Sequence, residues 1–198
     1  MTNIVAFPTD KKYNIIYADP PWEYGNKVFR KFRANKNAGS ALYHYDTMKL
    51  DDIMNIPVND IADENCILFM WATFPNLPQA LEVIKVWGFE YKTLGFSWIK
   101  KNKDQGYFFG IGHYTKSNCE VCLIAVKGKP KIISNKVSSV HVSTIEKHSK
   151  KPDAIREKIV QLCGDLPRIE LFARTKIHGW DTWGNDEKLD AKPLEVFF

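Results

Sequence analysis

An apolar segment that runs directly into two prolines is the feature that most constrains the fold of this chain. Residues 13–18 (YNIIYA) have the character of a buried strand, and the chain continues as Asp19-Pro20-Pro21-Trp22. The prolines fix two φ angles and push the preceding aspartate toward an extended conformation. The sequence therefore predicts a strand over 13–19 whose end presents a carboxylate and backbone carbonyls in fixed positions.

A rigid carboxylate beside an aromatic ring suits an exocyclic amine such as that of adenine. The amine has two N–H donors, and Asp19 with a neighbouring carbonyl can accept both, while Trp22 offers a flat face for stacking. Accepting both hydrogens draws the nitrogen lone pair out of conjugation, so that it can attack a methyl group without a covalent intermediate. The alternative is a plain strand end, in which Asp19 forms a turn and Trp22 packs in the core.

Strand and helix patterns alternate along the chain, which predicts an α/β fold around a largely parallel sheet. The continuous apolar run CILFMW at 66–71 is typical of a central strand covered on both faces. Further strands are expected at 91–100, 119–127 and 168–174. Helices are expected at 47–56, where Thr47 is the expected cap, and from Pro152 to Gly164.

A third helix, ended by Gly88, is expected to pack through apolar residues at helical spacing, namely Leu77, Ala80, Leu81, Ile84 and Trp87. Residues 128–150 and 178–185 are expected to be irregular or turn-rich.

Length and composition favour one soluble, globular domain over residues 1–198. The chain is 44% hydrophobic and 26% charged, without an apolar run of membrane-spanning length or an N-terminal leader pattern, so we expect a cytoplasmic protein. Its four cysteines are then expected to be reduced. Cys119 and Cys122 have the spacing of a zinc-ligand pair, but in a strand they face opposite ways, and no metal site is expected.

The net charge of +5 is concentrated in basic loops. In the loop at 27–36, five cations alternate with two phenylalanines and no acid, and Arg30, Lys31 and Arg33 lie at its centre. Basic residues bind phosphates and aromatic rings stack on unpaired bases, so this loop is a candidate nucleic-acid surface, with a solvated basic face as the alternative. The substrate loops are expected at about 23–46, 101–118 and 128–150.

Several ordered motifs resemble the MT-A family of S-adenosylmethionine-dependent N6-adenine methyltransferases. They are DPPW at 19–22, HSKKPD at 148–153, IELFAR at 169–174 and WDTWGN at 180–185, with intermediate matches at 44–48, 68–73 and 118–128. The resemblance implies a Rossmann-like sandwich with a permuted motif order, because the target-amine motif precedes the cofactor-binding strand.

The resemblance also implies roles for individual residues. Asp19, Pro20, Pro21 and Trp22 would hold the adenine amine, and Asp19 would also touch the cofactor. Lys151 would pair with the methionine carboxylate of S-adenosylmethionine. The other implied contacts are Glu170, Arg174 and Asn185 with the cofactor, and Tyr45 and Glu120 with the substrate. The structural alternatives are an exposed Lys151, an ion-paired Glu170, and packing roles for Trp180 and Trp183.

The leading hypothesis is therefore methylation of adenine N6 in DNA, because a compact chain resembles the bacterial and phage branch of this family. Methylation of RNA is the first alternative. A non-catalytic nucleic-acid-binding subunit is the second, although such a subunit would be expected to lose the acceptor motif, which is intact here. Target choice would come from the loops, from a homodimer or from a partner subunit.

Overall fold

The fold is built on one twisted sheet. The computed structural model describes residues 7–23, 47–104, 106–110, 114–146 and 150–184. Within these residues seven strands have the order β5-β3-β4-β2-β1-β6-β7. Their bounds are β1 Tyr13–Ala18, β2 Ala62–Ala72, β3 Glu90–Lys101, β4 Cys119–Lys127, β5 Val140–Thr144, β6 Arg168–Leu171 and β7 Asp181–Trp183. Strand β4 is antiparallel to β2 and β3, and the other neighbours are parallel.

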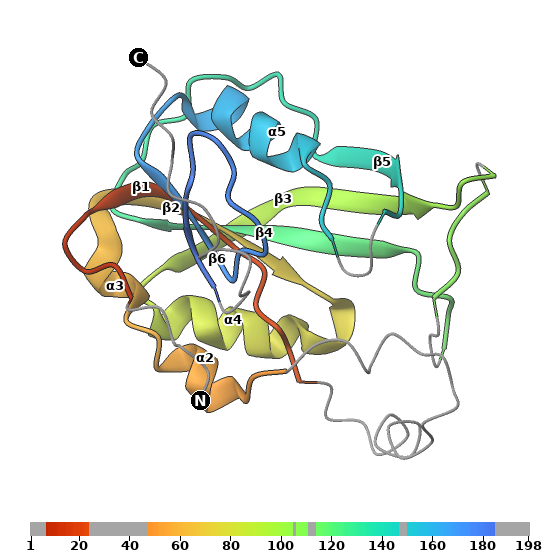
Figure 1. Cartoon of the computed structure of the whole chain (residues 1–198), viewed down its shortest axis with the longest axis horizontal. Coiled ribbons are helices and arrows are strands. Elements are labelled where there is room, and N and C mark those ends of the chain that lie inside the picture. Colours follow the sequence, from red (N-terminus) through yellow and green to blue (C-terminus); the bar gives the residue numbers. More distant parts are fainter. Residues whose placement is uncertain (1–6, 24–46, 105, 111–113, 147–149, 185–198) are drawn as a thin grey trace.

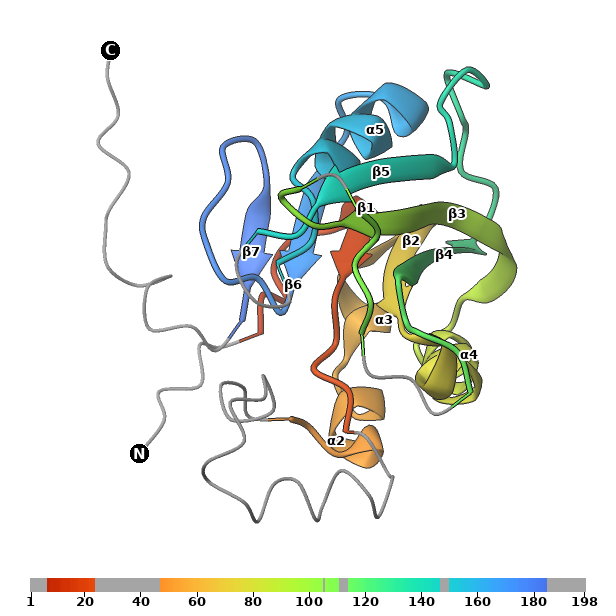
Figure 2. The ribbon, with the colours of Figure 1, turned by 90° about the vertical axis from the view of Figure 1, so that its right-hand side faces the viewer.

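Helices cover both faces of the sheet, which confirms the expected Rossmann-like α/β sandwich. One face carries α2 (Leu50–Met54), α3 (Val58–Ile61), the short 3-10 helix η2 (Phe74–Asn76) and α4 (Leu77–Val86), and the other carries α5 (Ala154–Cys163) (Figure 1). Figure 2 shows the same layers from the side, with α5 above the sheet and α2 and α4 below it. Of the described helices, none is long and apolar enough to cross a bilayer.

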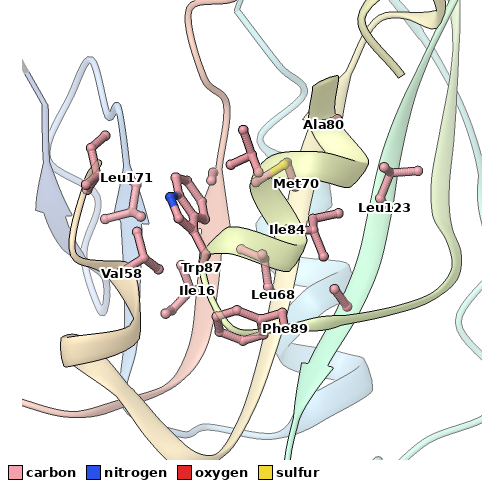
Figure 3. Close-up of a cluster of buried hydrophobic side chains, with 14 of the residues drawn as sticks. Ile16, Val58, Leu68, Met70, Ala80, Ile84, Trp87, Phe89, Leu123 and Leu171 are labelled. Carbon is pink, nitrogen blue, oxygen red and sulfur yellow. The ribbon is translucent and has the colours of Figure 1, made fainter. Parts of the chain in front are cut away.

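Strand β2 explains why the run at 66–71 has no polar residue. Leu68 and Met70 pack in the cluster on the α4 side (Figure 3), whereas Phe69 and Trp71 pack in the cluster on the α5 side. A strand buried on both faces needs apolar residues at every position. The prediction of a covered central strand is confirmed.

Helix α4 packs through a face slightly different from the expected one. Ala80, Ile84 and Trp87 are buried as expected, but Leu81 is exposed and Val83 takes its place in the core. Gly88 follows with a φ of +83°, a left-handed conformation that favours glycine and ends the helix.

Several expected elements differ from the observed ones. The helix expected from Thr47 begins at Leu50, with Lys49 at its N-cap and no side-chain cap. The segments expected to be irregular contain β5 and β7, short strands whose few residues leave too weak an apolar alternation to be seen in sequence. Strand β6 ends at Leu171, three residues early, because Phe172 has a φ of +60° and turns the chain.

The carboxyl ends of several strands lie together at one edge of the sheet. Strands β1, β2, β3 and β6 run in the same direction, so their carboxyl ends lie at one edge, where antiparallel β4 begins. Open α/β sheets bind ligands outside the carboxyl ends of their strands.

Candidate active site

The Asp19-Pro20-Pro21-Trp22 segment leaves the carboxyl end of β1 and is held by main-chain hydrogen bonds. The Trp22 amide donates to the Pro20 carbonyl at 2.9 Å, and the Met48 amide donates to the Pro21 carbonyl at 2.9 Å. Trp22 and Met48 also form an isolated bridge. The prolines have no N–H to offer, so these contacts fix their carbonyls without a regular element.

Lys151 lies just before α5 and reaches the Asp19 carboxylate. Its ammonium donates to both Asp19 oxygens, at 2.8 and 2.7 Å. The two side chains are only 10% and 21% exposed. The structure therefore brings these two predicted site residues together, and an exposed Lys151 is excluded.

Glu120 extends this pair into a chain of alternating charges. One oxygen of Glu120 lies 3.2 Å from the Lys151 ammonium, and the other forms a salt bridge with Lys100. Glu120 occupies the second position of β4, where its register partner on β3 is Trp98. The order of charges is Asp19, Lys151, Glu120 and Lys100, and we call these four residues the charge chain.

The electrostatics of the charge chain keep its inner members ionised. Burial alone would raise the pKa of Glu120, but the ammonium groups of Lys151 and Lys100 lower it to about 2. Burial alone would lower the pKa of Lys151, but Asp19 and Glu120 raise it above its ordinary value. Both groups are therefore charged at neutral pH, and each depends on the other.

Trp71 supports the charge chain from beneath. The Lys151 ammonium lies 5.4 Å from the centroid of the Trp71 ring, a cation–π distance. The indole N–H of Trp71 donates to the Tyr17 hydroxyl at 2.6 Å. The main-chain carbonyl of Trp71 accepts a hydrogen bond from the Trp22 indole N–H at 3.0 Å. Burial raises the pKa of Tyr17 well above its ordinary value, so the hydroxyl stays protonated.

Trp22 is a core residue in this structure. Its side chain is 8% exposed and belongs to the cluster on the α4 side of the sheet. The packing alternative therefore describes its surroundings, because a ring this buried presents little open face. Stacking of a base on Trp22 stays a prediction.

Glu170 lies on β6 in a second ion pair. Both of its oxygens accept from Arg156 of α5, each at 2.7 Å. Arg156 also pairs with Asp153 at 2.6 Å, and its guanidinium lies 5.6 Å from the Tyr17 ring centroid. Burial raises the pKa of Glu170, although Arg156 opposes the rise. The structural alternative for Glu170 is thus present, and its contact with a cofactor stays a prediction.

The remaining predicted residues divide into two groups. Arg174 is half-buried in the chain between β6 and β7, while Trp180 and Trp183 are buried, as their packing alternative expected. Predicted site residues that lie outside the described residues are Arg30, Lys31, Arg33, Tyr45 and Asn185.

Sequence reasoning missed the supporting residues Tyr17, Trp71 and Arg156. Tyr17 and Trp71 were hidden in apolar strands, where only the alternation of faces shows that both point toward α5. Lys100, near the end of β3, was also missed as the partner of Glu120. No cluster of three potential metal ligands occurs among the described residues, and all four cysteines are free thiols.

Most of the chain matches the model of one protein family. A family model described as MT-A70 matches residues 13–186. The chain is 38% identical over 187 residues to the Type II methyltransferase M.MunI of Mycoplasma sp, covering 88% of this chain and 77% of that protein. It is 29% identical over 181 residues to the human N(6)-adenosine-methyltransferase catalytic subunit METTL3, covering 88% of this chain but 28% of that protein. An Arabidopsis thaliana N(6)-adenosine-methyltransferase MT-A70-like protein is 25% identical over 177 residues, with 23% of its length covered.

Proposed function

The chain belongs to the MT-A70 family, and we propose on this premise that it transfers a methyl group from S-adenosylmethionine to the N6 amine of adenine in DNA. The observation that carries the proposal is the Asp19 carboxylate, held by Lys151 at the carboxyl end of β1. An oriented acceptor at such an edge is what an amine nucleophile requires.

Asp19 and the proline carbonyls have acceptor capacity left for the amine. A carboxylate offers about four lone-pair sites and a carbonyl two. Lys151 occupies two of these sites on Asp19. The Pro20 and Pro21 carbonyls each accept one hydrogen bond from a main-chain amide. Asp19 can accept one amine hydrogen while a carbonyl accepts the other. The amine nitrogen would form the new bond to the methyl carbon as the bond from that carbon to the sulfonium sulfur breaks, which leaves S-adenosylhomocysteine. The nitrogen would then release one proton, which partly exposed Asp19 would pass to water.

The charged residues at this edge fit the methionine end of S-adenosylmethionine. When bound, this cofactor supplies a methyl group on a sulfonium. Its methionine end has an ammonium and a carboxylate, and Lys151 and Asp19 present the opposite pair side by side. Lys151 would donate to the carboxylate and Asp19 would accept from the ammonium. Glu170, Arg174 and Asn185 are proposed to hold the ribose and adenine.

The choice of DNA over RNA rests on similarity. The sequence identity to the Type II methyltransferase is higher than to the N(6)-adenosine methyltransferases, and the chain covers a larger share of its length. Methylation of RNA is the second candidate, because those relatives match the same share of this chain. The loops about 23–46, 101–118 and 128–150 are proposed to contact the polynucleotide, and a homodimer or partner subunit to contribute to target choice.

The test is incubation of the protein with labelled S-adenosylmethionine and matched DNA and RNA oligonucleotides, followed by nucleoside mass spectrometry. We expect N6-methyladenine in DNA. Asp19→Asn should lower single-turnover transfer by on the order of a hundredfold, because it removes the negative charge and replaces one of the two acceptor oxygens with an N–H donor.

The matched control is Asp165→Asn. Asp165 lies just before β6, at the opposite edge of the sheet, and its exposed carboxylate pairs with Arg168. This variant should transfer at the wild-type rate. Methylation of RNA alone would favour the second candidate, and an unchanged rate in Asp19→Asn would remove Asp19 from the reaction.

A further inference from the structure

We propose that Tyr107 and Phe109 form a stacking surface for unpaired bases beside the target adenine. This inference rests on the proposed function and adds a substrate contact to it. The two rings belong to residues 106–110, which we call the aromatic segment. It follows β3 at the same edge of the sheet as the charge chain, where the chain projects past the end of β3 (Figure 1).

Main-chain hydrogen bonds hold the aromatic segment on both sides, to β3 and to the chain just ahead of β4. Tyr107 forms an antiparallel bridge with Lys101 of β3, and the Phe108 amide donates to the Lys100 carbonyl at 3.0 Å. On the other side, the Gly110 amide donates to the Ser117 carbonyl at 2.9 Å. A Cβ at Gly110 would lie 2.7 Å from that oxygen, so this close approach requires glycine. The rings of the segment therefore project from a supported backbone.

Neighbouring rings in the aromatic segment have opposite environments. Tyr107 and Phe109 are 55% and 63% exposed, whereas Phe108 between them is half-buried, with the Lys100 ammonium 5.9 Å from its ring centroid. Alternate side chains of an extended segment point to opposite sides. Phe108 thus packs against the sheet, and two large rings two positions apart remain on the solvent side.

Phe108 lies between these two exposed rings in sequence and contacts the charge chain through Lys100. Lys100 contacts Phe108 and pairs with Glu120, which contacts Lys151. Lys151 in turn holds Asp19. The stacking surface therefore adjoins the outer end of the charge chain, on the side opposite to Asp19.

Unpaired bases are the occupants that this surface fits. An enzyme that modifies adenine N6 must take the base out of the stack, which leaves neighbouring bases without their stacking partner. Exposed rings among lysines are the usual surface for such bases, and Lys101 and Lys103 lie just ahead of the aromatic segment. These lysines favour a polyanion over an apolar protein surface.

The experiment measures the affinity of the wild type and of the Tyr107→Ala, Phe109→Ala double variant for a DNA oligonucleotide with an unpaired adenine, across a salt series. Each lost stack should weaken binding by about tenfold, and the slope against salt should stay unchanged because no phosphate contact is removed. Binding of S-adenosylhomocysteine should not change. The matched control is Tyr91→Ala, a 44% exposed ring at the opposite end of β3, which should bind as the wild type does.

The conservative double variant Tyr107→Phe, Phe109→Tyr keeps both rings and should retain wild-type affinity. Unchanged affinity in the alanine double variant would overturn the proposal, as would an equal loss in Tyr91→Ala. A changed oligomeric state with unchanged DNA affinity would also overturn it, by making the surface a protein contact. Absence of methyl transfer by the wild type would overturn the proposed function instead, and the binding comparison would still decide the stacking surface.

Discussion

Lys151 forms ion pairs with two carboxylates at once. Its ammonium contacts Asp19 and Glu120, and all three side chains are largely buried. Its neighbour Lys150 is more exposed and pairs with Glu146 and Asp153. Of the two adjacent lysines, Lys151 therefore has a buried ion pair and Lys150 a surface ion pair.

Lys151→Met should lower the free energy of unfolding by about 3 kcal/mol, because removing one partner leaves buried charge uncompensated. Lys150→Met should lower it by less than about 1 kcal/mol, the usual range for a surface pair. Urea denaturation of both variants at pH 7 measures the difference. Equal losses would mean that the charge chain contributes no more than a surface ion pair.

Glu120 predicts how stability responds to acid. Its folded-state pKa of about 2 lies below its ordinary value of 4.5, so the folded state binds the proton less readily. The stabilisation is complete above the ordinary value and is lost as the pH falls from about 4.5 toward 2. Urea midpoints between pH 6 and 3 should therefore fall more steeply in the wild type than in Glu120→Gln. Parallel curves would show that the pKa of Glu120 is not depressed by folding.

At the scale of elements, β2 links the core to the site. Its apolar run predicted burial on both faces, and the pairing of the strands then places Trp71 under Lys151 and beside Tyr17. Strand β5 and the start of α2 could not be predicted in this way. Strand β5 is a short strand at the sheet edge with little apolar burial, and the Thr47 side chain makes no cap although its residue type suits one.

The contact between Trp71 and Tyr17 can be tested with a double-mutant cycle. Tyr17→Phe leaves the buried Trp71 N–H unsatisfied and should cost about 1 to 3 kcal/mol of unfolding free energy. Combined with Trp71→Phe, it should cost less than the sum of the two single changes.

The control for the cycle pairs Tyr17→Phe with Trp87→Phe. Trp87 lies in the cluster on the other face of the sheet and donates to the Ile53 carbonyl. These two changes should be additive in urea denaturation. Additivity in the Tyr17 and Trp71 pair as well would mean that their hydrogen bond does not couple them.

For the whole molecule, the site is a product of topology. Asp19 and Lys151 are 132 residues apart in sequence, and they meet because β1 and the chain entering α5 reach the same sheet edge. The motif identified Asp19 from residue types alone, and the resemblance identified Lys151 and Glu120. Neither could show that Lys151 pairs with both Asp19 and Glu120, because that depends on β4 being inserted between β2 and β3.

This dependence gives a test on the intact protein. S-adenosylhomocysteine at a hundred times its dissociation constant should stabilise the wild type by about 2.7 kcal/mol, seen as a rise in Tm. Lys151→Met should weaken its binding by roughly 10- to 100-fold through loss of a charge-assisted hydrogen bond. At the same ligand concentration the stabilisation should then fall to about 1.4 kcal/mol for a tenfold loss and about 0.4 kcal/mol for a hundredfold loss, with a matching decrease in the Tm rise. Lys150→Met should keep the full rise. An equal rise in both variants would remove Lys151 from the cofactor site.

The position of β4 also governs the order in which the sheet can be completed during synthesis. Strands β2 and β3 are made first, yet they are not neighbours, because β4 pairs with both. Until residues 119–127 leave the ribosome, β2 and β3 lack the strand that fills the gap between them in the finished sheet, and unpaired strand edges promote wrong pairing with other chains. The residue that completes the charge chain, Glu120, arrives on the strand that closes this gap.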